Sequence, residues 1–291
     1  MAWNPSDIPD QSGRTFVITG ANGGIGKQTT RALAGKGGTV IMACRNTDAA
    51  QRVADRIDGD VRVSALDLAD LASIRDFADR TGEIDVLINN AGLMYVPFSR
   101  TEDGFETQWG VNHLGHFALT GLLLDRLRDR VVTLSSIAHN QISKLRTDDL
   151  NYEHRKYQRN PAYSQAKLSN LMFARELQRR LTESGSSKRS YAVHPGVSAT
   201  DLFARTETPL DKVSKPFIAL VGHSPAKAAE SSLFAATMPD ADPAVYWGPT
   251  WLFGSRGPVR PAPSSTLSKD REVWRRLWEE SERLTDVTYK F

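Results

Sequence analysis

Up to residue 196 the chain alternates short apolar runs with longer stretches of helical pattern, and this alternation limits its fold more than any other feature. The apolar runs are rich in β-branched residues and poor in polar ones, as expected for strands buried on both faces. They are "RTFVIT" (14–19), "GTVIMAC" (38–44), "VRVSAL" (61–66), "IDVLIN" (84–89), "RVVTLSS" (130–136) and "RSYAVHP" (189–195). The helical stretches cover 24–36, 47–57, 70–80, about 103–126 and about 161–184. The pattern predicts an α/β fold, with a doubly wound parallel sheet and helices on both of its faces.

After residue 196 the alternation weakens. The segment 197–225 has scattered apolar residues without a period, and we interpret it as a mobile flap. The remaining pattern predicts a helix at 224–237, one more strand at 243–248, a Gly/Pro-rich loop at 248–265 and a helix at 268–284. Because no linker, repeat or low-complexity tract divides the chain, we expect a single domain, 1–291, with about seven strands.

The overall composition excludes several classes of protein. Hydrophobic residues make up 40% and charged residues 24% of the 291 positions, which is ordinary globular usage. The net charge of +3 is spread along the sequence, so we expect no nucleic-acid partner. The single cysteine, Cys44, excludes an internal disulfide and a cysteine-built metal site. Since there is no signal pattern and no apolar run near the ~18 residues of a membrane span, we expect a soluble cytoplasmic protein.

Glycines crowd the stretch "TGANGGIGK" (19–27), directly after the first predicted strand. It is not a triphosphate loop of the GxxxxGK[ST] type, because five residues separate Gly20 from Gly26 and Gln28 replaces the Ser or Thr. The spacing of Gly20, Gly24 and Gly26 still allows a sharp turn, close approach of a phosphate and tight packing of a helix. The N–H groups at the start of that helix would then face an anionic diphosphate. The alternative is a tight turn that holds no ligand.

"TGANGGIG" resembles the TGxxxGxG cofactor motif of the short-chain dehydrogenase/reductase family. The resemblance continues, in family order, through "LDL" (66–68), "NNAG" (89–92), "VNHLGHF" (111–117), "LSSIAH" (134–139), "YSQAK" (163–167) and "HPGVSAT" (194–200). The pieces "NHLGHF", "SSIAH" and "GPTWLFGSRG" are most similar to the branch that contains retinol dehydrogenases and related carbonyl reductases. The resemblance implies a single-domain Rossmann fold, with a cofactor half at about 12–135 and a catalytic and substrate half at about 136–291.

The end of the second predicted strand bears on the choice of dinucleotide. In NAD-binding Rossmann folds a carboxylate there bonds the ribose 2′-hydroxyl, whereas an arginine accommodates a 2′-phosphate. This strand ends "MACRN", with Arg45 and no carboxylate, and Lys27 adds positive charge. We therefore predict NADP(H) in preference to NAD(H), with a solvated surface arginine as the alternative.

The resemblance implies further contacts with the dinucleotide. The residues expected to contact the cofactor are Gly20, Asn22, Gly23, Gly24, Ile25, Gly26, Arg45, Asp67, Leu68, Asn89, Ala91, Gly92, Tyr163, Lys167, Pro195, Gly196, Val197 and Thr200. For Asn89, the alternative is an ordinary turn at the end of a strand.

Tyr163 and Lys167 are separated by four positions, so on a helix they share one face. Reduction of a carbonyl by hydride needs a proton, which a positioned phenol can deliver. A free tyrosine has a pKa of about 10, and an adjacent ammonium is expected to lower it. Ser136, at the end of the fifth predicted strand, is expected to orient the carbonyl, and Ser135 is the alternative because the strand phase allows either.

Two further features concern the surroundings of this pair. The resemblance implies that Asn112 supports a water linking Lys167 to solvent, whereas a helix kink or a backbone hydrogen bond is the alternative. The segment 137–162, between the serine and the tyrosine, is longer than in many family members, and the retinol-dehydrogenase branch carries a similar insertion.

No metal site is expected, because the histidines lie in separate segments without carboxylates at ligand spacing; they are His113, His116, His139 and His194. Apolar residues around the expected site predict a pocket that excludes water, with membership of the core as the alternative. They are Met94, Tyr95, Phe203, Phe217, Ile218, Leu220, Val221, Trp247 and Trp251.

Taken with the resemblance, these features predict an NADP(H)-dependent oxidoreductase that moves a hydride between nicotinamide and a lipophilic aldehyde, ketone or corresponding alcohol. The alternative is a catalytically inactive NADP(H)-binding sensor, which we would expect to lack the serine, the tyrosine or the lysine. The resemblance leaves open whether the chain forms a homodimer or a homotetramer. Many relatives pair through helices equivalent to 103–126 and 161–184.

Overall fold

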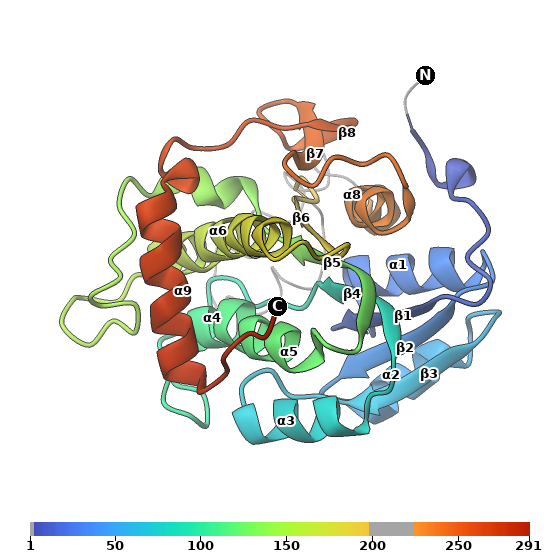
Figure 1. The fold of residues 1–291 in the computed structure, drawn as a ribbon, viewed down its shortest axis with the longest axis horizontal. Coiled ribbons are helices and arrows are strands. Elements are labelled where there is room, and N and C mark those ends of the chain that lie inside the picture. Colours follow the sequence, from blue (N-terminus) through green and yellow to red (C-terminus); the bar gives the residue numbers. More distant parts are fainter. Residues whose placement is uncertain (1–2, 198–223) are drawn as a thin grey trace.

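The computed structural model describes residues 3–197 and 224–291. A sheet of eight strands forms its centre, in the order β3-β2-β1-β4-β5-β6-β7-β8 (Figure 1). Neighbouring strands are parallel except for the last pair, β7 and β8. The strands are β1 (Thr15–Thr19), β2 (Thr39–Cys44), β3 (Val61–Ala65), β4 (Ile84–Asn89), β5 (Leu127–Leu134), β6 (Arg189–Val193), β7 (Tyr246–Trp251) and β8 (Arg256–Pro261). The predicted doubly wound sheet is confirmed.

Helices cover both faces of the sheet because side chains alternate along each buried strand. In β1, Phe16 and Ile18 belong to one hydrophobic cluster and Val17 to another. The first cluster is covered by α1 (Gly24–Ala34), α2 (Thr47–Ala54) and α8 (Pro225–Thr237), and the second by α3 (Leu71–Arg80), α5 (Gly115–Leu123) and α6 (Arg159–Glu183). Figure 1 shows α1 and α8 on one side of the sheet and α3 and α5 on the other.

The predicted helix at 103–126 is shorter and less regular than expected. It starts at α4 (Thr107–Trp109), continues as a π-helical turn (Gly110–Leu114) and ends with α5. The remaining elements are 3-10 turns at Pro5–Asp7, Ile137–Gln141 and Leu267–Lys269, and the last helix, α9 (Arg271–Thr285).

The prediction of a loop at 248–265 was wrong, because part of this segment pairs with β7 as the antiparallel edge strand β8. Prolines suggested a loop, but an edge strand tolerates them since its outer N–H groups pair with no neighbouring strand. The predicted flap at 197–225 lies outside the described residues except at its two ends.

The outer surface of α5 and α6 is covered by α9 and by the chain that follows it. Trp278 is 2% exposed, and its ring lies 5.1 Å from Phe117 of α5 and 5.9 Å from Phe173 of α6. Tyr289 packs against the same two rings and donates a hydrogen bond from its hydroxyl to the Phe117 carbonyl at 2.6 Å. The helices through which many relatives are expected to pair are therefore covered here by the chain's own C-terminal segment.

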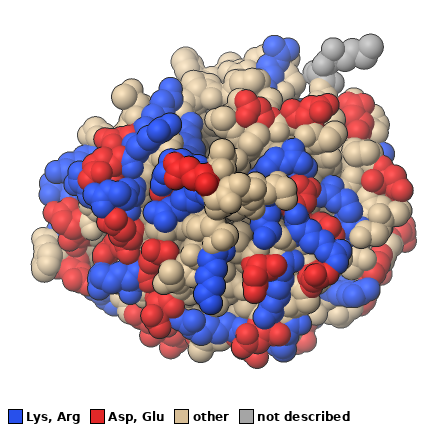
Figure 2. Space-filling model, viewed as in Figure 1, with Lys and Arg blue, Asp and Glu red and all other residues tan. Residues whose placement is uncertain are grey.

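The surface of the molecule carries both basic and acidic side chains. Figure 2 shows Lys and Arg side chains interspersed with Asp and Glu across the face that it presents. On α9, Arg275 contacts Glu272 and Glu279 at 2.7 Å, in exposed pairs that stabilise a fold only slightly. Within residues 3–197 and 224–291, no helix combines the length and the apolar character needed to cross a membrane.

Candidate active site

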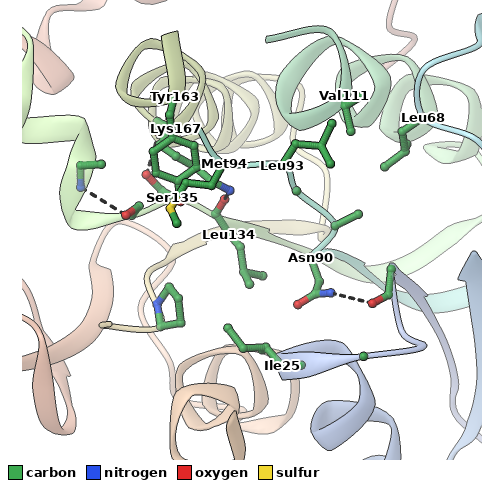
Figure 3. Close-up of a pocket in the computed structure, with 18 of the residues that line it drawn as sticks. Ile25, Leu68, Asn90, Leu93, Met94, Val111, Leu134, Ser135, Tyr163 and Lys167 are labelled. Carbon is green, nitrogen blue, oxygen red and sulfur yellow. Dashed lines mark hydrogen bonds between the residues drawn. The ribbon is translucent and has the colours of Figure 1, made fainter. Parts of the chain in front are cut away.

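A cavity of about 520 Å³ lies at the carboxyl ends of the parallel strands. Residues that follow successive strands contribute to its lining: Gly20 after β1, Arg45 after β2, Asp67 after β3, Asn90 after β4 and Pro195 after β6. Figure 3 shows the close-up, with Tyr163 and Lys167 projecting from one helix on the side opposite Ile25. Ligands of doubly wound sheets bind at this edge, where the strand order reverses.

The glycine-rich turn forms one wall of the cavity. Gly20 has φ +64° and Gly24 has φ +48°, so both adopt the left-handed conformation that disfavours other residues. At Gly26, a Cβ atom would lie 2.7 Å from the Asn90 side chain and from the Gly20 carbonyl, so only glycine allows this close packing of helix and sheet. The cap residue of α1, Gly23, makes no side-chain hydrogen bond, which leaves the first N–H groups of the helix available to an anion.

Most of the residues expected around a dinucleotide line this cavity. They are Gly20, Asn22, Gly23, Gly24, Ile25, Arg45, Asp67, Leu68, Ala91, Gly92, Tyr163, Lys167, Pro195, Gly196 and Val197. Gly26 is buried in the first turn of α1 and does not line the cavity, and Thr200 lies outside the described residues.

Asn89 does not line the cavity, contrary to expectation. It is 1% exposed, and its side-chain amide donates to the Thr120 hydroxyl at 3.0 Å. Its neighbour Asn90 lines the cavity instead and donates to the Thr19 carbonyl at 2.7 Å. Successive residues at the end of a strand face opposite sides, so an error of one position exchanges the two roles.

Arg45 and Asp67 face each other at the end of the cavity formed by β2 and β3. Their closest charged atoms, Nη1 and Oδ2, are 3.9 Å apart, and the side chains are 68% and 35% exposed. This is a loose, solvated ion pair, so the guanidinium retains N–H groups for another anion.

Tyr163 and Lys167 lie on α6, both buried, with the lysine Nζ 5.8 Å from the centre of the phenol ring. The ammonium donates to the Leu134 carbonyl at 3.1 Å. Burial lowers the pKa of Lys167 to about 8, because the charged form loses hydration.

The acidity of the phenol differs from expectation. Burial raises the pKa of Tyr163, and the Ser136 side chain acts in the opposite direction without outweighing it. Desolvation is therefore stronger than the effect expected from the neighbouring ammonium, and it favours the neutral phenol.

The two serines after β5 have different surroundings. Ser135 is 2% exposed and donates from its hydroxyl to the Lys167 carbonyl at 2.6 Å. Ser136 is half-buried, and its hydroxyl accepts the N–H of Ala138 at 3.2 Å. Both serines line the cavity, and the Ser136 side chain acts to lower the pKa of Tyr163, as a hydroxyl near the phenol would.

Asn112 lies in the π-helical turn and holds the chain that follows β4. Its amide accepts the N–H of Leu93 at 2.7 Å and donates to the Leu93 carbonyl at 2.9 Å. A Cβ atom on Gly92 would lie 3.2 Å from this amide and 3.5 Å from the Lys167 ammonium. Asn112 thus approaches Lys167 across Gly92 and makes the backbone hydrogen bonds that were the alternative for it.

Three of the four histidines considered for a metal site form hydrogen bonds within the protein. His116 bonds the Thr19 hydroxyl and the Asn112 carbonyl, His113 bonds Ser281, and His139 bonds the Ser136 carbonyl at 2.6 Å. In the described part of the chain, no three His, Cys, Asp or Glu side chains are grouped to hold a metal ion.

The apolar wall beside Tyr163 is smaller than expected within the described residues. Met94, Ala138 and Tyr163 form a hydrophobic cluster, with Tyr95 packed against it. Trp247 packs on Phe234 instead, and Trp251 is 59% exposed at the end of β7, so neither lines the cavity. The other expected residues, Phe203, Phe217, Ile218, Leu220 and Val221, lie outside the described ranges.

Comparison with known proteins agrees with this geometry. The family model described as short chain dehydrogenase matches residues 14–147. Human retinol dehydrogenase 13 is 43% identical, covering 94% of this chain and 85% of its own, and mouse retinol dehydrogenase 14 is 36% identical, covering 94% and 86%.

Solved structures are also similar to this chain. A putative uncharacterized protein from Mycobacterium paratuberculosis superposes with a TM-score of 0.88 at 45% identity, over 100% of both chains. A 3-ketoacyl-(acyl-carrier-protein) reductase from Brucella melitensis, solved with NADH, shares the fold at a TM-score of 0.59 and 21% identity, covering 78% of this chain and 92% of its own. This chain therefore belongs to the short-chain dehydrogenase/reductase family, in its retinol dehydrogenase-like branch, and is an oxidoreductase by family.

Proposed function

We propose that this oxidoreductase uses NADP(H) to interconvert lipophilic aldehydes or ketones and their alcohols. The observation that carries the proposal is a single cavity lined both by the glycine-rich turn and by Tyr163, Lys167 and Ser136. A dinucleotide held at the turn would extend toward the buried phenol at the other end of the same cavity.

The residues present fit a dinucleotide. The close packing at Gly26 leaves no room for a side chain, and the first N–H groups of α1 have no side-chain cap, so a diphosphate fits beside the turn. Arg45 supports a 2′-phosphate, because it is largely exposed and only loosely paired with Asp67. A guanidinium binds phosphate through forked, charge-assisted hydrogen bonds.

The proposed chemistry assigns a task to Tyr163, Ser136, Lys167 and Asn112. A bound nicotinamide would supply or accept the hydride. Tyr163 donates its proton to the oxygen of the reduced carbonyl, and Ser136, which lines the same cavity, orients that oxygen. Lys167 stabilises the phenolate that remains and, with a pKa of about 8, exchanges protons readily near neutral pH. We retain for Asn112 the role of supporting a water between Lys167 and solvent.

A lipophilic substrate is supported by the apolar side chains beside the phenol, Met94, Tyr95 and Ala138. The names of the relatives point to retinol-like alcohols. Because water is poorly accommodated among such side chains, the reacting carbon would be shielded from it.

The test is oxidation of NADPH and of NADH with a panel of apolar aldehydes and ketones. We expect turnover with a higher kcat/KM for NADPH, and we expect Tyr163→Phe to lower kcat by about 10²-fold or more while binding of NADPH is retained. Tyr152→Phe, which removes a buried hydroxyl that has no partner, is the matched control and should leave kcat unchanged. A protein that binds NADPH but turns over no carbonyl is the inactive sensor, and a preference for NADH contradicts the assignment of Arg45.

A further inference from the structure

A tyrosine beside the catalytic phenol has a strained backbone. Tyr95 has φ +56°, in the left-handed region that residues other than glycine rarely adopt. Its ring packs edge-on against Tyr163, with centroids 5.5 Å apart and planes at 77°. Strain of this kind persists only where the surroundings enforce it, and it concentrates at functional sites.

Three hydrogen bonds fix the backbone of this strained residue and of the next one. The Tyr95 N–H donates to Gln108 Oε1 at 2.7 Å, and its carbonyl accepts from Arg159 at 3.5 Å. The Val96 carbonyl accepts the hydroxyl proton of Tyr157 at 3.0 Å. All three partners come from other parts of the chain, so the loop after β4 is held from outside.

These partners also bind one another. Gln108 is fully buried, and its Nε2 donates to the Tyr157 hydroxyl at 2.7 Å and to the Arg159 carbonyl at 2.9 Å. One side-chain amide thus links the strained loop to the long segment 137–162, in which Tyr157 lies. The carboxylate of Glu106, also fully buried, accepts the backbone N–H of Gln108 at 2.8 Å and fixes the turn that carries it.

We infer that Tyr95 is a specificity-determining residue that limits the space beside the catalytic phenol, and that Gln108 and Tyr157 are its positioning residues. The inference rests on the proposed function, in that the phenol must be the acid of a carbonyl reduction. It assigns a task to the long segment before Tyr163: this segment holds the wall of the substrate site through Tyr157.

The first test uses Tyr157→Phe, which removes one hydroxyl and keeps the ring. Tyr152→Phe is its matched control, because the ring of Tyr152 lies 5.2 Å from that of Tyr157 while its hydroxyl has no partner. We expect hydrogen exchange in the peptide 93–98 to become about 10-fold faster in Tyr157→Phe and to stay unchanged in the control. Equal exchange in the two variants overturns the positioning role, and this measurement needs no turnover.

The second test compares kcat/KM for 2-naphthaldehyde and benzaldehyde, two aldehydes that differ by one fused ring. We expect the ratio in favour of the larger aldehyde to rise about 10-fold in Tyr95→Ala, to rise less in Tyr157→Phe, and to stay unchanged in Tyr95→Phe, which keeps the ring. A ratio within twofold of the wild-type value in Tyr95→Ala overturns the specificity role. If the wild-type protein reduces no carbonyl, the proposed function fails, and the exchange measurement still decides whether Tyr157 positions the loop.

Discussion

The Ser135 hydroxyl donates to the backbone carbonyl of Lys167 at 2.6 Å, and so connects the end of β5 to the helix that carries Tyr163 and Lys167. That hydroxyl is committed to the structure and is almost fully buried. Both serines line the cavity, and the adjacent Ser136 accepts the N–H of Ala138 with its hydroxyl. We therefore expect the two serines to have separable tasks.

Exchange of either serine for alanine should show which of the two acts in catalysis. We expect Ser136→Ala to lower kcat/KM by about 10²-fold, because a hydrogen-bond donor at the developing charge is lost. It should also lower the unfolding free energy by about 1 kcal/mol, because the Ala138 N–H loses its acceptor. Ser135→Ala should lower the unfolding free energy by about 1 kcal/mol and leave kcat nearly intact. Steady-state kinetics and urea denaturation measure the two effects. A larger catalytic loss in Ser135→Ala would exchange the assignments.

The sequence predicted the pair on α6 because two residues four positions apart must share a helix face. It did not decide between Ser135 and Ser136, and it placed Asn89 rather than Asn90 at the cavity. Both difficulties have one physical cause: at the end of a strand, one residue of shift moves a side chain from one face to the other. The sequence also could not predict that Tyr163 is buried and that burial raises its pKa. This burial depends on side chains distant in sequence, such as Met94.

Arg45 should determine the choice between the two dinucleotides. We expect Arg45→Ala to lower kcat/KM for NADPH by about 10- to 100-fold, because a charge-assisted hydrogen bond to phosphate contributes about 1.5–3 kcal/mol. The value for NADH should change by less than about threefold, since no phosphate is then available for binding. Parallel losses with both cofactors would indicate that Arg45 supports the site in general rather than the 2′-phosphate.

Burial of Lys167 predicts a specific pH dependence of stability. Its pKa is about 8 in the folded protein and 10.5 ordinarily, so between these values the unfolded chain binds more protons and stability rises with pH. Lys167→Met should abolish this rise. The difference in unfolding free energy between wild type and variant should change by about 1–2 kcal/mol from pH 8 to about pH 9.5, in favour of the wild type. Urea denaturation at a series of pH values, without added cofactor, measures it.

In the difference between wild type and variant, the contributions of other groups that titrate in the same pH range cancel. Burial raises the pKa values of Cys44 and Tyr246, so both oppose the rise as the pH approaches their ordinary values, but they do so in wild type and variant alike. A constant difference across the range would show that Lys167 is not desolvated in solution.

The strand–helix alternation was enough to predict the parallel sheet, because each buried strand leaves a β-branched apolar run. It was not enough for β8, where Pro258 and Pro261 suggested a loop and only pairing with β7 makes the strand. The π-helical turn at Gly110–Leu114 was also missed as an element, since an extra residue per turn leaves the apolar pattern almost unchanged.

The docking of the C-terminal segment on α5 depends on one glycine. At Gly121 a Cβ atom would lie 2.6 Å from Val287 and 2.7 Å from the Tyr289 ring, whose hydroxyl is itself fixed on the Phe117 carbonyl. A methyl group there must therefore displace the segment that covers the helix. Overpacking of this kind costs about 1–3 kcal/mol, whereas alanine gains about 1 kcal/mol of helix propensity over glycine.

We therefore expect Gly121→Ala to lower the unfolding free energy by up to about 2 kcal/mol and to make the chain after α9 more sensitive to proteolysis. Gly82→Ala is the matched control, because a Cβ atom at that exposed position meets nothing within 4 Å, and its effect should stay within about 0.5 kcal/mol. Urea denaturation and limited proteolysis of both variants check the expectation. If Gly121→Ala is as stable and as resistant as the control, the segment 287–291 does not pack on α5 in solution, and the outer surface of α5 would be free for pairing with a second copy.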